Sequence, residues 1–170
     1  MRKEKKINNH GMTAIEMLVS FIIVSAIVIG LFDVVMNYRN KQQIESIYNS
    51  VVAYSNSLQK TIQDDLIKKH VNHVSNVQAQ QIDFYLDNPQ ETTHLEIDCA
   101  NGQIRYGSLD NVINYPIPEI ADLTLSTDSK IDYIVGNVNL VRITIVLEHP
   151  NLENERYTFQ IVSPLNFTSA

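Results

Sequence analysis

Hydrophobic residues fill the first part of the chain without a break. From Met17 to Phe32, sixteen residues carry no charge, and only Ser20, Ser25 and Gly30 soften the apolar run. A helix from Met12 to Asp33 would be roughly 31 Å long, which is about one hydrocarbon thickness of a bilayer. The pattern therefore predicts a membrane-spanning helix over residues 12–36.

A helical pattern continues beyond the apolar run. Apolar side chains recur there at spacings of three or four residues, at Ile44, Ile47, Tyr48, Val51, Tyr54, Leu58, Ile62 and Leu66. This period is that of an amphipathic helix, and no proline interrupts residues 12–88. We expect the helix to continue to about His70, and residues 37–77 to form the amphipathic continuation of the membrane segment.

After Val77 the hydrophobic period changes to two, which is typical of strands. The candidate strands are residues 81–86, 94–98, 103–107, 121–126, 131–135, 140–149 and 156–163. Asn101-Gly102 predicts a hairpin turn, and residues 140–163 read as a second hairpin with a longer loop. Short turns between successive strands indicate a mostly antiparallel sheet packed on the helix. The expected fold class is therefore α+β, with residues 78–170 as a β-rich head.

Charge is unevenly spread along the 170 residues. The first eleven residues carry a net charge of +3, which leaves −9 for the rest of a chain whose total is −6. Basic residues before an apolar helix keep the N-terminus cytoplasmic and place the head outside. The acidic body argues against direct nucleic-acid binding. Cys99 is the single cysteine, which excludes an intrachain disulfide and a multi-cysteine zinc site.

Glu16 is the one carboxylate near the start of the apolar run. An ordinary signal peptide is the first alternative, but no A-x-A cleavage site follows Phe32. A carboxylate at the centre of a membrane helix costs about 2.5–3.5 kcal/mol on insertion scales, and less near the interface. Glu16 is therefore either an interfacial residue of a signal anchor or a functional intramembrane charge with a partner.

The basic leader, Gly11, and a glutamate five residues later at the start of an apolar helix together resemble the class III signal of type IV prepilins and pseudopilins. The resemblance implies that residues 1–11 are a leader peptide, cut between Gly11 and Met12 by prepilin peptidase. It also implies N-methylation of Met12, although phenylalanine is commoner at that position. In this family the glutamate, here Glu16, neutralises the N-terminal amine of a neighbouring subunit. The order of the later strands loosely resembles minor pilins related to the J pseudopilin of type II secretion and to the competence F-type minor pilin.

The resemblance implies a structural subunit of a pilus-like filament: a minor pilin or pseudopilin of a pilus, competence or secretion machine. Its partners would be other pilins of the same filament, prepilin peptidase and, before assembly, the membrane that it crosses once. Two alternatives stay open. One is a signal-anchored extracytoplasmic binding or sensor domain with an uncleaved helix, and the other is a membrane-tethered enzyme.

The sequence contains few residues that could be catalytic or could bind a metal. His70 and His73 lie three residues apart near the predicted helix end, but only Asp64 and Asp65 are near enough to add ligands. His94 and His149 are isolated, and no nucleophile signature accompanies Asp83. We expect no catalytic residue, no metal and no cofactor. Cys99 is expected to be a small buried side chain, and residues 114–120 are the favoured subunit contact.

Overall fold

The computed structural model describes residues 13–86 and 91–167, and the predicted Gly11–Met12 cleavage site lies outside them. The chain forms two units, Met1–Gln43 and Ile44–Ala170. One α-helix, α1 (Ala14–Lys68), runs through both, and strands follow it. The helix packs against a mostly antiparallel sheet of six strands, so the α+β prediction is confirmed.

Helix α1 ends at Lys68, close to the predicted end at about His70. Within the head, one stripe of its surface is buried, made of Ile47, Val51, Ser55, Leu58, Ile62 and Leu66. These residues are three or four apart, which is the spacing of a single helix face. The amphipathic pattern in the sequence therefore corresponds to a real packing face, and most of its predicted apolar positions are the buried ones.

The first sheet contains six strands in the order β10-β1-β2-β3-β4-β5. Their bounds are β1 (His70–Ser75), β2 (Gln81–Leu86), β3 (Thr92–Asp98), β4 (Gln103–Ser108), β5 (Asn111–Pro116) and β10 (Asn166–Phe167). Neighbours are antiparallel except β10 and β1, which are parallel. The predicted hairpin turn at Asn101-Gly102 joins β3 to β4, and Gly102 has a φ of +60°, which glycine adopts without strain.

The second sheet is built around β8 (Leu140–Glu148). Strands β6 (Thr124–Leu125) and β7 (Lys130–Ile134) pair with it, and so does β9 (Arg156–Pro164), all antiparallel. The β8–β9 loop includes a short 3₁₀ helix, η1 (Glu153–Glu155), and the two strands form the second predicted hairpin. After β9 the chain passes into β10, so its last described residues join the two sheets.

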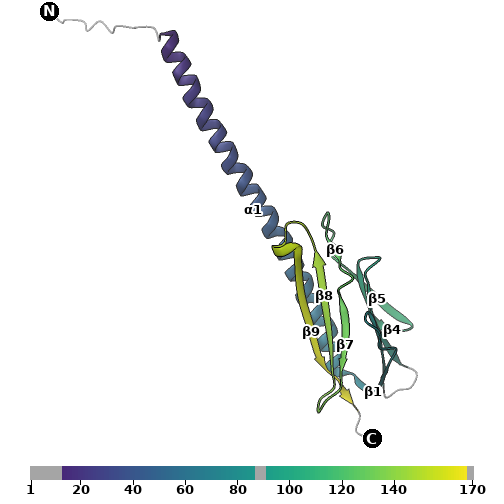
Figure 1. The fold of residues 1–170 in the computed structure, drawn as a ribbon. Helices are drawn as coiled ribbons and strands as arrows, with labels where there is room; N and C mark the ends of the chain where they lie inside the picture. Colours follow the sequence, from purple (N-terminus) through teal and green to yellow (C-terminus); the bar gives the residue numbers. More distant parts are fainter. Residues whose placement is uncertain (1–12, 87–90, 168–170) are drawn as a thin grey trace, which may run out of the picture. The chain divides into compact units, whose positions relative to one another are not determined.

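The core of the head lies between the buried stripe of α1 and both sheets (Figure 1). Tyr54 shows this double contact. Its ring meets Phe159 of β9 edge-on at 6.4 Å, and its hydroxyl donates to the Tyr115 carbonyl of β5 at 3.1 Å. Leu58, Ile62 and Leu66 are at most 1% exposed, and burying a side chain of this size contributes about 1.5–3 kcal/mol.

Four strands differ from the sequence prediction. Residues 70–75 form β1, so the prediction that the helical segment continues to residue 77 is wrong. No strand was predicted over residues 111–116, which form β5, or over residues 166–167, which form β10. The segment at 121–126 keeps only the two residues of β6 as a strand. Ile67, Val71 and Val74 are four and three residues apart, which is a helical spacing, and this is why the pattern did not reveal the change to a strand.

Candidate functional site

The N-terminal half of α1 is an exposed apolar helix. Ile15 is 77% exposed, Phe21 74% and Phe32 63%, and the helix is long and apolar enough to cross a membrane. Large apolar side chains exposed over this length cannot remain in water without association. This segment therefore requires a lipid bilayer or other helices as its environment.

Glu16 lies in the first turn of α1 and forms a reciprocal pair with Thr13. The Thr13 backbone N–H donates to Glu16 Oε2 at 2.7 Å, and the Glu16 backbone N–H donates to Thr13 Oγ1 at 3.3 Å. The Thr13 hydroxyl adds a third hydrogen bond to the same carboxylate at 3.0 Å. This is a capping box, which satisfies N–H groups that the first turn of a helix leaves without partners. This capping role of Glu16 was not predicted, although the T-x-x-E spacing signals it.

The histidines predicted near the helix end are on a strand. His70 and His73 belong to β1, and the His73 ring stacks on Tyr85 of β2 at 4.3 Å between centroids. The expectation that both lie on one helix end is wrong because the helix has already finished at Lys68. Within residues 13–86 and 91–167, no group of three His, Cys, Asp or Glu side chains is placed to hold a metal ion.

His94 is not isolated in the fold. Antiparallel pairing of β2 with β3 sets it opposite Asp83, and its Nδ1 lies 2.6 Å from Asp83 Oδ1. Its Nε2 lies 3.5 Å from Glu96, which Arg105 of β4 pairs at 2.8 Å. Both ring nitrogens thus face carboxylates, and neither is free for a substrate. The cluster ties three strands together and offers no nucleophile.

The acidic residues near the end of α1 also hold the fold together. Asp65 accepts a hydrogen bond from the Tyr106 hydroxyl of β4 at 2.6 Å and pairs with Lys69 at 2.7 Å. Lys69 in turn donates to Thr93 of β3. These contacts fasten the last turn of the helix to the first sheet. Asp65 is therefore occupied by structural partners.

Cys99 is partly buried beside the β3–β4 turn, where it packs against the core and donates to the Ser126 carbonyl. Burial first, and then the neighbouring Asp98 charge, raise the pKa of its thiol. The thiolate is the reactive form of cysteine, so this thiol is a poor nucleophile.

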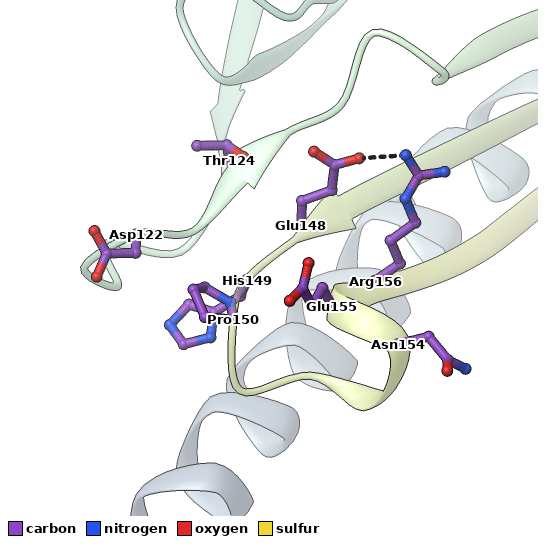
Figure 2. Close-up of a pocket in the computed structure, with 8 residues that line it drawn as sticks. All are labelled: Asp122, Thr124, Glu148, His149, Pro150, Asn154, Glu155 and Arg156. Atoms are coloured by element: carbon purple, nitrogen blue, oxygen red, sulfur yellow. Dashed lines mark ion pairs between the residues drawn. The ribbon is translucent and has the colours of Figure 1, made fainter.

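A polar pocket of the head lies between β6 and the β8–β9 loop and has a volume of about 350 Å³. It is lined by Asp122, Thr124, Glu148, His149, Pro150, Asn154, Glu155 and Arg156. Figure 2 shows the Arg156 guanidinium paired with Glu148 on one side of the pocket, and Asp122 and His149 on the other side. Pairing of β6 with β8 brings Asp122 close to a loop some thirty residues further along the chain.

The pocket combines a buried histidine with an ion pair. His149 is 6% exposed, and its Nδ1 accepts the Asn151 backbone N–H at 3.0 Å. Arg156 bridges two carboxylates, Glu148 and Asp128, each at 2.9 Å. The sequence offered no signal for this site, because His149 has no titratable residue beside it other than the Glu148 that ends the strand.

Comparison with known proteins supplies no relative from which to take a function. No protein-family model matches the chain, and neither a curated protein nor a solved structure does. The chain is described by its own architecture: a transmembrane-capable N-terminal helix joined to an α+β head.

Proposed function

We propose that this chain is a minor pilin or pseudopilin, a non-enzymatic structural subunit of a pilus-like filament. The observation that carries the proposal is the division of α1 into two halves of different character. Every large apolar side chain from Ile15 to Phe32 is exposed, whereas the buried residues of the helix begin at Ile47. One helix therefore supplies both a segment for a bilayer or helical bundle and the spine of a separate head.

Glu16 fits this proposal as an assembly contact. It is the only charged residue between His10 and Asp33. In a bundle of apolar helices, an opposite charge on a neighbouring subunit would be attracted strongly, and each charge alone would be penalised. After cleavage behind Gly11, the new amine at Met12 supplies that opposite charge. The pair would then favour the register in which an incoming subunit docks.

The capping box favours a second candidate. Thr13 gives Glu16 hydrogen-bond partners within its own helix, so the carboxylate has a use without any neighbouring subunit. A signal-anchored extracytoplasmic binding domain with an uncleaved helix has the same features. The two candidates differ in whether residues 1–11 are removed.

Substitution of Gly11 tests the proposal. Gly11→Leu adds a side chain where a peptidase must approach the backbone, so processing should stop. The unprocessed chain would keep its +3 leader, stay in the membrane fraction and be absent from sheared surface fibres. Asn9→Leu is the matched control, since it adds similar bulk two residues before the cut. Equal amounts of mature-sized protein from both variants would contradict the filament proposal.

A further inference from the structure

We propose that the free edge of β9, together with an apolar pocket beside its first residues, binds an extended segment of a partner polypeptide. The segment would carry a large apolar side chain between basic residues and would add to the second sheet as a further strand. Both features belong to the head alone, and the inference does not depend on the filament proposal.

Strand β9 pairs with β8 on one side, and Figure 1 shows it at the outside of that sheet. Two backbone hydrogen bonds flank the ladder. Leu165 N–H donates to the Asn139 carbonyl at 2.9 Å, and His149 N–H donates to the Glu155 carbonyl at 3.0 Å. Because bonded and non-bonded pairs alternate in an antiparallel ladder, every second residue of β9 turns its N–H and C=O away from β8. These residues include Thr158, Gln160 and Val162, and no backbone group of residues 13–86 and 91–167 bonds them.

This edge lacks the features that usually keep a sheet edge from pairing. The nine β8–β9 pairs run without a bulge, and residues 157–163 contain no proline and no charge. The edges at β5 and β7 are protected, since β5 ends in Pro116 and β7 carries the Lys130–Asp132 ion pair. Natural sheets protect their edges in these ways because exposed backbone groups accept another strand. The unprotected edge of β9 therefore indicates a site of strand addition.

An apolar pocket of about 440 Å³ adjoins the start of this edge. Its walls come from α1 and from the β8–β9 hairpin, and they include Ile44, Tyr48, Leu152 and Tyr157. The Tyr48 and Tyr157 rings meet edge to face at 5.8 Å. Thr158, a residue of the free edge, also lines the pocket. A strand paired with β9 points alternate side chains to the α1 side of the sheet, so the residue opposite Tyr157 would place its side chain in this pocket.

The charge of the lining favours a basic partner. Glu45 and Glu153 line the pocket, and within the described part of the chain neither forms an ion pair. Arg156, which also lines it, already bridges Glu148 and Asp128. Basic residues on either side of the apolar side chain would therefore meet carboxylates without a counter-charge. A second copy of this chain fits less well, because the chain without its first eleven residues has a net charge of −9.

The test uses the full-length, ¹⁵N-labelled chain in neutral detergent micelles and the peptide acetyl-Thr-Lys-Val-Phe-Val-Lys-Thr-amide. In an extended strand its phenylalanine and both lysines lie on one face, and its sequence reads the same in either direction. The peptide should bind saturably and slow the hydrogen exchange of the Thr158 and Gln160 amides. Methylation of both valine nitrogens removes the donors that would face β9, and it should weaken binding about tenfold or more.

Ile44→Ser and Ile67→Ser are the matched variants. Both isoleucines lie on α1 with similar exposure, 42% and 40%, and Ile44 lines the pocket whereas Ile67 does not. Ile44→Ser should weaken binding of the peptide about fivefold, and Ile67→Ser should leave it unchanged. The amide signals of β8 and β9 verify that both variants keep the hairpin.

Equal binding of the methylated and unmethylated peptides would overturn the proposal, and so would equal loss in the two serine variants. Tight binding of a peptide with glutamate in place of both lysines would overturn the assignment to a basic partner. Slow exchange of the Thr158 and Gln160 amides before any peptide is added, with a dimeric protein mass by analytical ultracentrifugation, would show that a second copy occupies the edge and would also overturn it.

Discussion

Thr13 and Glu16 hold each other at the first turn of α1, each accepting a hydrogen bond from the other's backbone N–H. The pair gives the only carboxylate of the apolar segment a local function. It also makes the two proposed roles of Glu16 separable, because a capping box needs a hydrogen-bond acceptor at this position but not a charge.

Glu16→Gln should separate capping from assembly. Glutamine keeps the acceptor for the Thr13 N–H but removes the charge that would pair with a neighbour's amine. We expect normal helix content and membrane insertion, with about tenfold or greater loss from sheared filaments, since a bundle leaves the neighbour's charge without a partner. Quantitative immunoblots of membrane and filament fractions measure this.

Thr13→Val is the companion variant, because it removes the hydroxyl cap and keeps the carboxylate. It should enter filaments nearly as well as the unmodified chain. If Thr13→Val and Glu16→Gln reduced assembly equally, or if Glu16→Gln had no effect, Glu16 would be a capping residue only.

Removal of residues 1–36 should leave a soluble, folded, acidic head. Every buried side chain of α1 lies at or beyond Ile47, so the fragment keeps the whole helix face that packs on the sheets. Circular dichroism should show mixed helix and strand with a cooperative thermal transition, and EDTA should not change it. Unfolding on chelation would mean that a metal had been missed.

Gly107→Ala should destabilise the head. Gly107 has a φ of +147°, and a Cβ there would overlap the backbone carbonyl oxygen of Asn111 in the adjacent strand. Backbone has little freedom to move, so we expect a loss of about 2–4 kcal/mol in the free energy of unfolding. Urea denaturation of the head measures it.

Gly102→Ala is the control for that loss. Gly102 also has a positive φ, but its added Cβ would meet only the Ile117 side chain at 3.4 Å. The loss in the free energy of unfolding should therefore be only that of an alanine in the left-handed conformation, about 1–2 kcal/mol. A larger loss for Gly102→Ala than for Gly107→Ala would contradict the geometry of the β4–β5 turn.

Much of the head was predictable because its strands are short segments rich in apolar and β-branched residues, separated by turn residues. The segments at 81–86 and 140–149 were expected almost as they occur, and Asn101-Gly102 located the first hairpin. Strand β1 was not, because Val71 and Val74 are three residues apart, which is a helical spacing and not the period of two that indicates a strand. Asp83 and His94 form a pair only through the register of β2 and β3, which local patterns do not reveal. The pocket depends in the same way on the pairing of β6 with β8.

Stability of the head should fall at alkaline pH. Burial, and then the hydrogen bond to Asp65, raise the pKa of Tyr106 above the ordinary value of 10.0, and burial does the same for Tyr54. In the unfolded chain both phenols ionise near pH 10, whereas in the fold they stay protonated. Their contribution is therefore complete below pH 10 and is lost as the pH rises further.

Tyr106→Phe checks this dependence. The variant should lose about 1–2 kcal/mol at neutral pH, because a hydrogen bond to a carboxylate disappears. Urea unfolding of the head between pH 8 and pH 11 should then show a shallower alkaline decline than in the unmodified head. An identical slope in both proteins would mean that Tyr106 ionises as readily in the fold as in the unfolded chain.

The mature N-terminus tests the central claim most directly. Mass spectrometry of the protein extracted from the membranes of its native host, with the N-terminal peptide sequenced, identifies the first residue and its modification. The filament account predicts a chain that begins at Met12 and carries one methyl group on its amine. A chain that still begins at Met1, with residues 1–11 intact, would contradict the account and leave the signal-anchored binding domain in its place.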